Sequence, residues 1–404
     1  MSLSRRNLLR NLGVGAVVGA AAPALRGFPL APAMEEALWG NSAPVPAAGG
    51  VAVEPVLLYR NENPYGPSEK VVAAMREAAA GGNRYPRAEY DTLLDKLAAL
   101  HKVKREQILL GCGSGEILCM AATAFLKPGK KLVEAAPTFP ALGKLAQTAG
   151  IEVADVPLNK RYEHDLAAML DRAIYASAAS AGTSSGSAIP ANGGLVYIVN
   201  PNNPTGTITP RKDMEAFIAK LPAGVTVLID EAYHHFVAPG AEYESFLDRP
   251  IGDPRVIVAR TFSKIYGLAG MRIGYAVATP EIAKRLTAGF PGWSVSVVSA
   301  SAASVALDDA DYVRLGVKRN TDDRQEFMKQ AAARKLFVIP SQTNFVMFDP
   351  QRPPDDVIAH LKKHNILIGP KYPALDKYIR VSLGQPDEMK LFWDAWDQMP
   401  PARS

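Results

Sequence analysis

Three short apolar segments, each followed at once by polar residues, constrain the fold of this chain more than any other feature. They cover residues 195–199, 225–229 and 256–259, and their length and their content of Val and Ile are typical of buried strands. Upstream of them, strand and helix segments alternate from residue 108 to residue 156. This alternation predicts an α/β fold with a mainly parallel sheet. Because ligands of such sheets bind beyond the carboxyl ends of the strands, we expect the three polar segments to meet at one site.

The third segment leads into Ser263 and Lys264, and Arg272 follows in a glycine-rich loop. A lysine amine that is held neutral at a strand end is suited to condense with the aldehyde of pyridoxal phosphate. The serine hydroxyl and the guanidinium would supply a donor and a cation for the phosphate of that cofactor. We therefore predict that Lys264 carries pyridoxal phosphate. An isolated lysine would be interpreted as a solvated surface residue, but the two other strand ends argue against that interpretation here.

The first two strand segments end in the residues that such a cofactor ring requires. Asp230 can pair with the protonated ring nitrogen, and at 4 Å with an effective dielectric constant near 20 the attraction is about 4 kcal/mol, which keeps the ring an electron sink. Asn203 and Tyr233 can donate hydrogen bonds to the phenolic oxygen, and Phe139 can stack on the ring face. The alternative for the Asn and Asp residues is an ordinary role in turns and helix caps.

A glycine-rich turn at residues 111–116 joins a strand at 108–110 to an apolar helix at 117–125. Backbone N–H groups converge at such a helix N-terminus, where phosphate binds readily. Tight packing is the alternative explanation for the glycines. Near the end of the chain, Arg380 lies in the apolar strand segment 378–384, where a guanidinium can clamp a carboxylate through two parallel hydrogen bonds. A surface arginine is the alternative there.

In this order, the residues 200–206, 230–233, 263–264 and 268–272 and the Arg380 strand resemble the class I/II, fold-type I aminotransferases. The resemblance covers about residues 55–400, and the most similar branch is histidinol-phosphate aminotransferase. It implies a homodimer in which each subunit has a large domain, with a mainly parallel sheet flanked by helices, and a smaller α+β domain.

The resemblance also assigns roles to individual residues. It implies that the catalytic residues are Lys264, Asp230 and Tyr233. It implies that the cofactor is held by Ser114, Gly115, Phe139, Asn203, Asp230, Tyr233, Ser263, Lys264 and Arg272, and by Tyr85 of the neighbouring subunit. It implies that the substrates, an amino donor and a 2-oxo acid acceptor, are bound by Arg380, Asn63 and Tyr65. Gly115 and Phe139 depart from the acidic residue and the tyrosine that are usual in the branch, but neither position touches the core chemistry.

Two other functions stay open at this point. A pyridoxal phosphate-dependent decarboxylase or lyase would use the same residues to stabilise the same carbanion. A non-catalytic binding module would keep the fold without the chemistry, but the intact Lys264, Asp230 and Arg380 argue against it.

The N-terminal segment predicts export through the twin-arginine route. Residues 1–24 combine a basic start that includes Arg5 and Arg6, an apolar run at 12–22 and a small-residue site at 22–24. The apolar run is too short to span a bilayer, which needs about 20 residues. An N-terminal amphipathic helix is the alternative. The twin-arginine route carries folded proteins, which agrees with a cofactor that binds only a folded chain. A periplasmic location leaves the substrate open, because histidine synthesis is expected inside the cell.

We expect the following division of the chain. A flexible lead at 25–54 precedes an N-terminal arm and small-domain helix at 55–82. The large cofactor-binding domain covers 83–288 and contains a low-complexity insertion at 177–194, and the small C-terminal domain covers 289–404.

Charge and cysteine content exclude other classes of partner. Subtracting Arg5, Arg6 and Arg10 of the export segment from the 45 basic residues leaves 42 against 40 acidic residues, which argues against a nucleic-acid surface. If Cys112 and Cys119 both lay on the helix after the glycine-rich turn, they would be about 10 Å apart along its axis, beyond the roughly 7 Å limit for a disulfide. We therefore expect free thiols, and the absence of a CxxC pair gives no support to a metal site.

Overall fold

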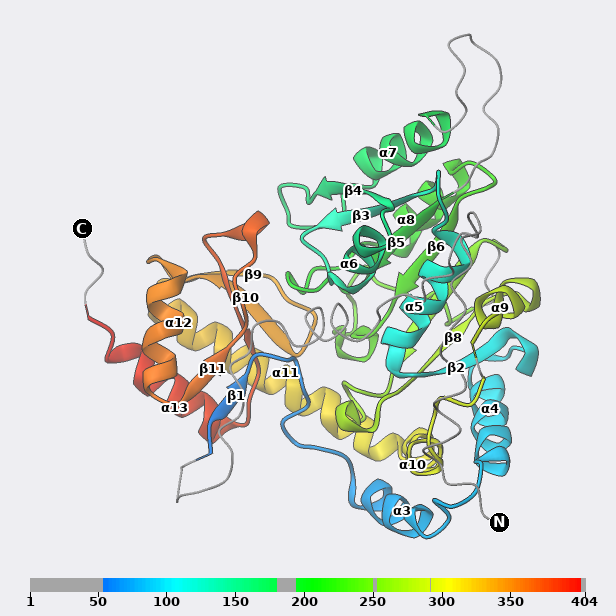
Figure 1. Cartoon of the computed structure of the whole chain (residues 1–404). Helices are drawn as coiled ribbons and strands as arrows, with labels where there is room; N and C mark the ends of the chain where they lie inside the picture. Colours follow the sequence, from blue (N-terminus) through cyan, green and yellow to red (C-terminus); the bar gives the residue numbers. More distant parts are fainter. Residues whose placement is uncertain (1–53, 180–193, 250–252, 291, 401–404) are drawn as a thin grey trace, which may run out of the picture.

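The structure, a computed structural model, describes four stretches of the chain: residues 54–179, 194–249, 253–290 and 292–400. Figure 1 shows them as a larger unit around a seven-stranded sheet and a smaller unit beside it. The predicted export signal at 1–24, nearly all of the predicted lead at 25–54 and most of the predicted insertion at 177–194 lie outside the described residues.

The sheet of the larger unit has the strand order β2-β8-β7-β6-β5-β3-β4. Its strands are β2 (Ile108–Cys112), β3 (Lys131–Ala136), β4 (Glu152–Pro157), β5 (Leu195–Val199), β6 (Thr226–Asp230), β7 (Val256–Thr261) and β8 (Ile273–Val277). Every pairing is parallel except the two that β8 makes, which confirms the predicted α/β fold. Because β5, β6 and β7 are parallel neighbours, the polar segments that follow them begin at the same edge of the sheet, as expected.

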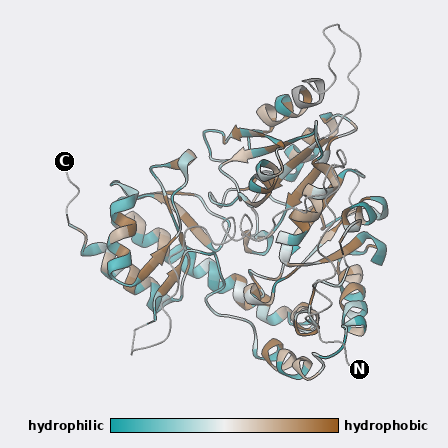
Figure 2. Ribbon diagram, viewed as in Figure 1, coloured by the Kyte–Doolittle hydropathy of each residue, from teal (hydrophilic) through white to brown (hydrophobic). Residues whose placement is uncertain are grey.

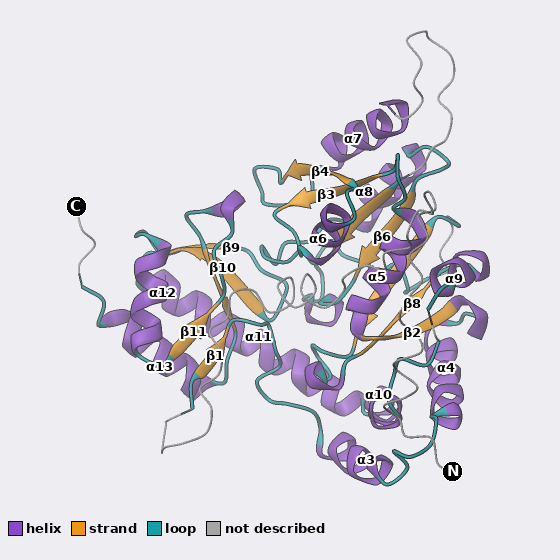
Figure 3. Cartoon of the chain, viewed as in Figure 1, coloured by secondary structure: helices purple, strands orange, loops and turns teal. Residues whose placement is uncertain are grey.

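Helices cover both faces of this sheet (Figure 3). The core on one face includes residues of α3 (Glu69–Ala79), α4 (Arg87–His101), α7 (Leu166–Ala179), α8 (Arg211–Lys220) and α10 (Val297–Asp308). The core on the other face includes residues of α5 (Gly113–Phe125), α6 (Ala141–Thr148) and α9 (Pro280–Thr287). Side chains of β5 alternate between the two cores, since Val196 and Ile198 lie in the first and Tyr197 in the second. Figure 2 shows the apolar strands between helices that have polar outer surfaces.

The smaller unit combines two small sheets with helices. Its elements are β1 (Val56–Leu58), α11 (Ala310–Ala333), β9 (Phe337–Ile339), β10 (Phe345–Asp349), α12 (Pro354–Lys363), β11 (Ile366–Ile368), β12 (Ile379–Ser382) and α13 (Pro386–Asp397). β12, β10 and β9 form an antiparallel sheet, and β1 pairs with β11 in parallel. The unit is therefore α+β and draws on both ends of the described chain. The short 3-10 helices of the structure are η1 (Arg105–Gln107), η2 (His234–Phe236), η3 (Ala269–Met271) and η4 (Pro373–Leu375).

The structure groups α3 and α10 with the larger unit, whereas the sequence placed α3 with the small domain and began the C-terminal domain at 289. Ala300 and Ala303 of α10 are fully buried in the same core as Val71 of α3. Small side chains allow these two helices to approach closely. The 24 residues of α11 then extend from this region to the smaller unit (Figure 1).

Both cysteines are free, as predicted, but Cys112 is the exposed last residue of β2 and only the buried Cys119 lies on α5. The argument from helix geometry was therefore wrong for Cys112. Among the described residues, no helix is long and apolar enough to cross a membrane, and no cluster of His, Cys, Asp or Glu has the composition of a metal site.

Candidate active site

Lys264 follows β7 and is partly buried at the edge where the parallel strands end. Its Nζ donates hydrogen bonds to the backbone carbonyls of Asn61, at 2.9 Å, and Arg60, at 3.2 Å, and lies 5.5 Å from the centre of the Tyr233 ring. Burial, and after it the positive charge of Arg380, lower the pKa of this amine to about 8. The neutral form of the amine, which is the nucleophile, is therefore accessible near neutral pH.

Asp230, the last residue of β6, is a buried carboxylate that faces the same site. Its Oδ2 accepts from the hydroxyl of Tyr197 and its Oδ1 from the backbone N–H of Ala232, both at 3.1 Å. Burial raises the pKa of Asp230 to about 6, while these two hydrogen bonds and the charge of Lys264 lower it. A cation placed against this carboxylate would be stabilised strongly in such surroundings.

The glycine-rich turn and Arg272 form the anion-binding end of the site. α5 begins at Gly113, immediately after β2, so the first backbone N–H groups of the helix, including those of Ser114 and Gly115, have no partner within the helix. A Cβ at Gly113, whose φ is +73°, would lie only 2.2 Å from Nη2 of Arg272. The missing side chain thus lets the guanidinium lie against the helix start. Arg272 Nη1 is 3.0 Å from the carbonyl of Ala269 and 3.5 Å from Oγ of Ser263.

This combination of a helix N-terminus, a guanidinium and a serine hydroxyl fits a phosphate group. Together with the amine of Lys264 and the carboxylate of Asp230, the donor set fits pyridoxal phosphate, which carries a phosphate, an aldehyde and a basic ring nitrogen.

Arg380 reaches the site from β12 of the smaller unit. Its Nη1 donates to Oδ1 of Asn203 at 2.6 Å and its Nη2 to the carbonyl of Tyr59 at 2.7 Å. The buried Nε has no hydrogen-bond partner among the described residues. The guanidinium lies 5.5 Å from the ring centres of Phe345 and Tyr372. The guanidinium of Arg380 could therefore bind a substrate carboxylate, because its N–H donors are only partly paired within the described residues.

The model of the family described as aminotransferase class I and II matches residues 53–395 of this chain. The chain belongs to the class I and II aminotransferases. A histidinol-phosphate aminotransferase of Carboxydothermus hydrogenoformans is 36% identical to this aminotransferase over 332 residues, which are 81% of this chain and 86% of the relative. One from Symbiobacterium thermophilum is 34% identical over 342 residues, 84% of this chain and 89% of the relative.

A solved structure agrees with these relatives. Histidinol-phosphate aminotransferase of Sinorhizobium meliloti, in complex with pyridoxal 5′-phosphate, superposes with a TM-score of 0.75 and 29% identity over 85% of this chain and 90% of that chain. The comparisons confirm the predicted fold type, the aminotransferase activity and the cofactor.

The remaining predicted site residues of this aminotransferase lie at different distances from Lys264. Asn63 donates to the carbonyl of Ile265 at 2.9 Å, next to Lys264. The Tyr65 hydroxyl donates to Asp323 on α11 at 3.0 Å, so its contacts run toward the smaller unit. Phe139 is partly buried and packs against the core that contains α5 and α6. Tyr85 is 81% exposed and makes an edge contact with Trp293, also exposed, on the surface.

Among the residues that contact the site and were not predicted from the sequence, Asn61 and Tyr197 contact it through their side chains. Asn61 donates from Nδ2 to the Tyr233 hydroxyl at 3.1 Å, and Tyr197 donates to Asp230. Asn61 lies in the N-terminal arm and has a left-handed backbone conformation, with φ +54°, in which Asn is enriched. Nothing in the strand pattern distinguishes Tyr197 from other buried aromatic residues.

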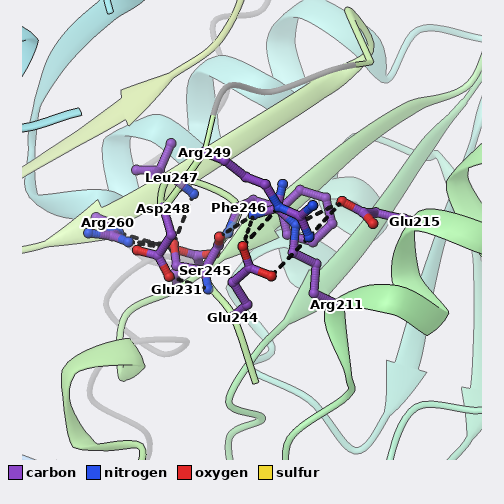
Figure 4. A network of polar contacts seen from close by, with 10 residues as sticks. All are labelled: Arg211, Glu215, Glu231, Glu244, Ser245, Phe246, Leu247, Asp248, Arg249 and Arg260. Carbon is purple, nitrogen blue, oxygen red and sulfur yellow. Dashed lines mark hydrogen bonds and ion pairs between the residues drawn. The ribbon is translucent and has the colours of Figure 1, made fainter. Parts of the chain in front are cut away.

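Behind the site, a buried ion pair connects the ends of β6 and β7 (Figure 4). Oε2 of Glu231 accepts from Nη2 of Arg260 at 2.9 Å and from Oγ of Ser245 at 2.6 Å, and Oε1 accepts from the backbone N–H of Phe246 at 2.8 Å. Glu231 directly follows Asp230, and Arg260 lies four residues before Lys264. The ion pair therefore helps to fix the two strand ends that carry the catalytic residues.

Proposed function

We propose that this aminotransferase carries pyridoxal phosphate on Lys264 and transfers an amino group between an amino acid or amino-alcohol phosphate and a 2-oxo acid. The observation that carries the proposal is the convergence of a partly buried amine with a lowered pKa, a buried carboxylate and a partly unpaired guanidinium, supplied by Lys264, Asp230 and Arg380. The names of the relatives make histidinol phosphate the first amino-alcohol phosphate to test.

The residues of this chain divide the work as follows. When bound, pyridoxal phosphate supplies an electron sink for the substrate carbon that bears the amino group. The anionic Asp230 would keep the ring nitrogen protonated, and Arg380 would orient the substrate through its carboxylate. The free Nζ of Lys264 would be the base that takes the proton from the substrate carbon and returns it.

The experiment mixes purified holoprotein with a panel of amino donors, including histidinol phosphate, and identifies the products while the cofactor absorbance is followed. Transamination leaves pyridoxamine phosphate on the protein and a carbonyl product in solution. Release of carbon dioxide would instead assign the decarboxylase alternative. In the Lys264→Ala variant, turnover should be lost and the cofactor retained only non-covalently, and a covalently bound cofactor in that variant would remove Lys264 from its role.

We infer that the active form is a homodimer, in which Tyr85 contacts the phosphate bound to the neighbouring subunit. The resemblance to the family and the 81% exposure of Tyr85 beside the 61% exposed Trp293 support this assembly. Sedimentation analysis of the holoprotein should give twice the subunit mass, and Tyr85→Phe should release the cofactor faster without changing that mass. A monomer with full activity would contradict the inference.

We also propose export of the folded holoenzyme through the twin-arginine route, because residues 1–24 have the pattern of such a signal. Cleavage is expected near Ala24, with residues 31–33 as a second candidate. The substrate would then be an amino compound available outside the cytoplasm. Replacing Arg5 and Arg6 together by Lys, followed by cell fractionation, tests the route, and mature protein in the periplasm at the parent level would contradict it.

A further inference from the structure

Asn61 lies at the centre of contacts that join the N-terminal arm, the smaller unit and the site. It is 1% exposed, and its φ of +54° lies in the left-handed region, where Asn is enriched. Its backbone N–H donates to Oγ of Ser382 at 2.8 Å, while its carbonyl accepts from Lys264 and, at 3.0 Å, from Asn344. These backbone contacts hold Asn61 between the smaller unit and the site.

The hydrogen bonds around Asn61 also determine the direction of each proton. Oγ of Ser382 already accepts the backbone proton of Asn61, and it donates its own proton to Oδ1 of Asn61 at 3.0 Å. This leaves Nδ2 facing the Tyr233 hydroxyl at 3.1 Å. An amide NH₂ group can only donate. The Tyr233 oxygen therefore accepts from Asn61, and the hydroxyl proton is free to be donated to another acceptor.

We propose that Asn61 is a positioning residue that holds Tyr233 as a hydrogen-bond donor to the phenolic oxygen of the cofactor ring. The inference rests on the proposed function, since it takes Tyr233 to face that ring. A donor at the phenolic oxygen stabilises the more negative form of the bound cofactor. The pH at which the visible absorbance of the bound cofactor changes is therefore lower than it would be without the donor.

The same contact links the cofactor ring to substrate recognition. Ser382 and Arg380 are both buried, and as residues two apart on β12 they point to the same face of the strand. β12 thus carries Arg380, which faces the substrate carboxylate, and Ser382, which orients the amide of Asn61. Because that amide in turn positions Tyr233, the position of β12 affects both the guanidinium of Arg380 and the hydroxyl of Tyr233.

The test inverts the polarity of the contact with Asn61→Asp, which nearly preserves the shape of the side chain. The introduced carboxylate only accepts, so Tyr233 would donate to it and be lost to the cofactor. The absorbance of substrate-free holoprotein is titrated against pH in the parent, in Asn61→Asp, in Tyr233→Phe and in the double variant. We expect the midpoint of the absorbance change to be about one pH unit higher in Asn61→Asp than in the parent. The double variant should differ less from Tyr233→Phe, because only the direct effect of the new charge is left there.

Equal shifts in the two backgrounds, or no shift in Asn61→Asp, would overturn the inference. Circular dichroism shows whether Asn61→Asp folds. If Asn61→Asp does not fold, Ser382→Ala tests the inference instead, because it removes the hydroxyl that orients the amide of Asn61. The midpoint should then rise by less than is expected for Asn61→Asp. An unchanged midpoint counts against the inference. A parent protein that binds no pyridoxal phosphate is a different failure, since it refutes the proposed function before any variant is compared.

Discussion

The hydroxyl of Tyr197 donates a hydrogen bond of 3.1 Å to Oδ2 of Asp230 across the neighbouring strands β5 and β6. Both residues are almost completely buried. Burial favours the protonated carboxyl group, and it is the main reason why the pKa of Asp230 is raised to about 6. The hydrogen bond from Tyr197 opposes that effect because it stabilises the anion. Tyr197 therefore helps to keep Asp230 charged for the ring nitrogen that we place against it.

We expect Tyr197→Phe to raise the pKa of Asp230 by about one to two units, the worth of a hydrogen bond to a charged group. A less stable carboxylate stabilises the ring cation less, so the ring nitrogen should lose its proton at a lower pH than in the parent. ¹⁵N NMR of cofactor labelled at the ring nitrogen measures this directly. Tyr275→Phe is the matched control, because Tyr275 is also buried but bonds His101 at 2.8 Å. Identical titrations of parent and Tyr197→Phe would show that the hydrogen bond does not tune Asp230.

The lowered pKa of Lys264 predicts the pH dependence of cofactor attachment. Only the neutral amine attacks the aldehyde, and the folded-state pKa of about 8, against 10.5 for an ordinary lysine, means that this form dominates above pH 8. The rate at which cofactor-free protein binds pyridoxal phosphate covalently should rise tenfold per pH unit below 8 and then level off. Stopped-flow absorbance measures the rate. Since the charge of Arg380 also lowers this pKa, Arg380→Gln should move the plateau to higher pH, and a parent rate that still rises at pH 10 would contradict the prediction.

Local sequence patterns were sufficient to predict the three strands whose ends carry Asn203, Asp230 and Lys264. β5, β6 and β7 follow one another in the chain and are adjacent in the sheet, so their polar ends meet for reasons that the sequence displays. Contacts between distant segments were not predictable in this way. Asn61 bonds Ser382, 321 residues further along the chain, and Tyr197 reaches Asp230 only because of the register between two strands. The α3–α10 contact was missed for the same reason, since small residues on a helix do not reveal which helix packs against them.

The buried pair of Glu231 and Arg260 predicts a large loss of stability when one partner is removed. Arg260→Met leaves the Glu231 carboxylate buried without its cation, which costs about 3 to 5 kcal/mol. Arg249→Met is the matched control at the exposed end of the same network, where the ion pair with Glu244 is worth at most about 1 kcal/mol. Urea unfolding of both holoprotein variants compares the two losses. Equal losses would mean that burial of the pair does not govern its contribution.

The last prediction concerns Glu134, a buried carboxyl group in the middle of β3 that the proposed chemistry does not use. Its Oε2 has no hydrogen-bond partner among the described residues. A Cβ on Gly143 of α6 would lie only 2.1 Å from Oε1, so the group is enclosed by the helix above the sheet. Burial, and after it the charge of Asp155, raise its pKa from 4.5 to about 8.

A carboxyl group whose pKa is higher in the folded than in the unfolded chain binds a proton on folding. Between pH 4.5 and 8 the folded chain holds that proton and the unfolded chain does not, so Glu134 lowers the free energy of unfolding by about 1.4 kcal/mol for each pH unit of increase. Glu134→Gln, which is always neutral, should therefore gain stability over the parent as the pH rises from 4.5, and the gain should become constant above about 8. Glu152→Gln, an exposed residue of β4 paired with Lys131 at 2.6 Å, should show no such growing difference. Urea unfolding of the three proteins from pH 5 to pH 9 makes the comparison, and a gain that does not depend on pH would mean that Glu134 ionises as freely in the folded chain as in the unfolded one.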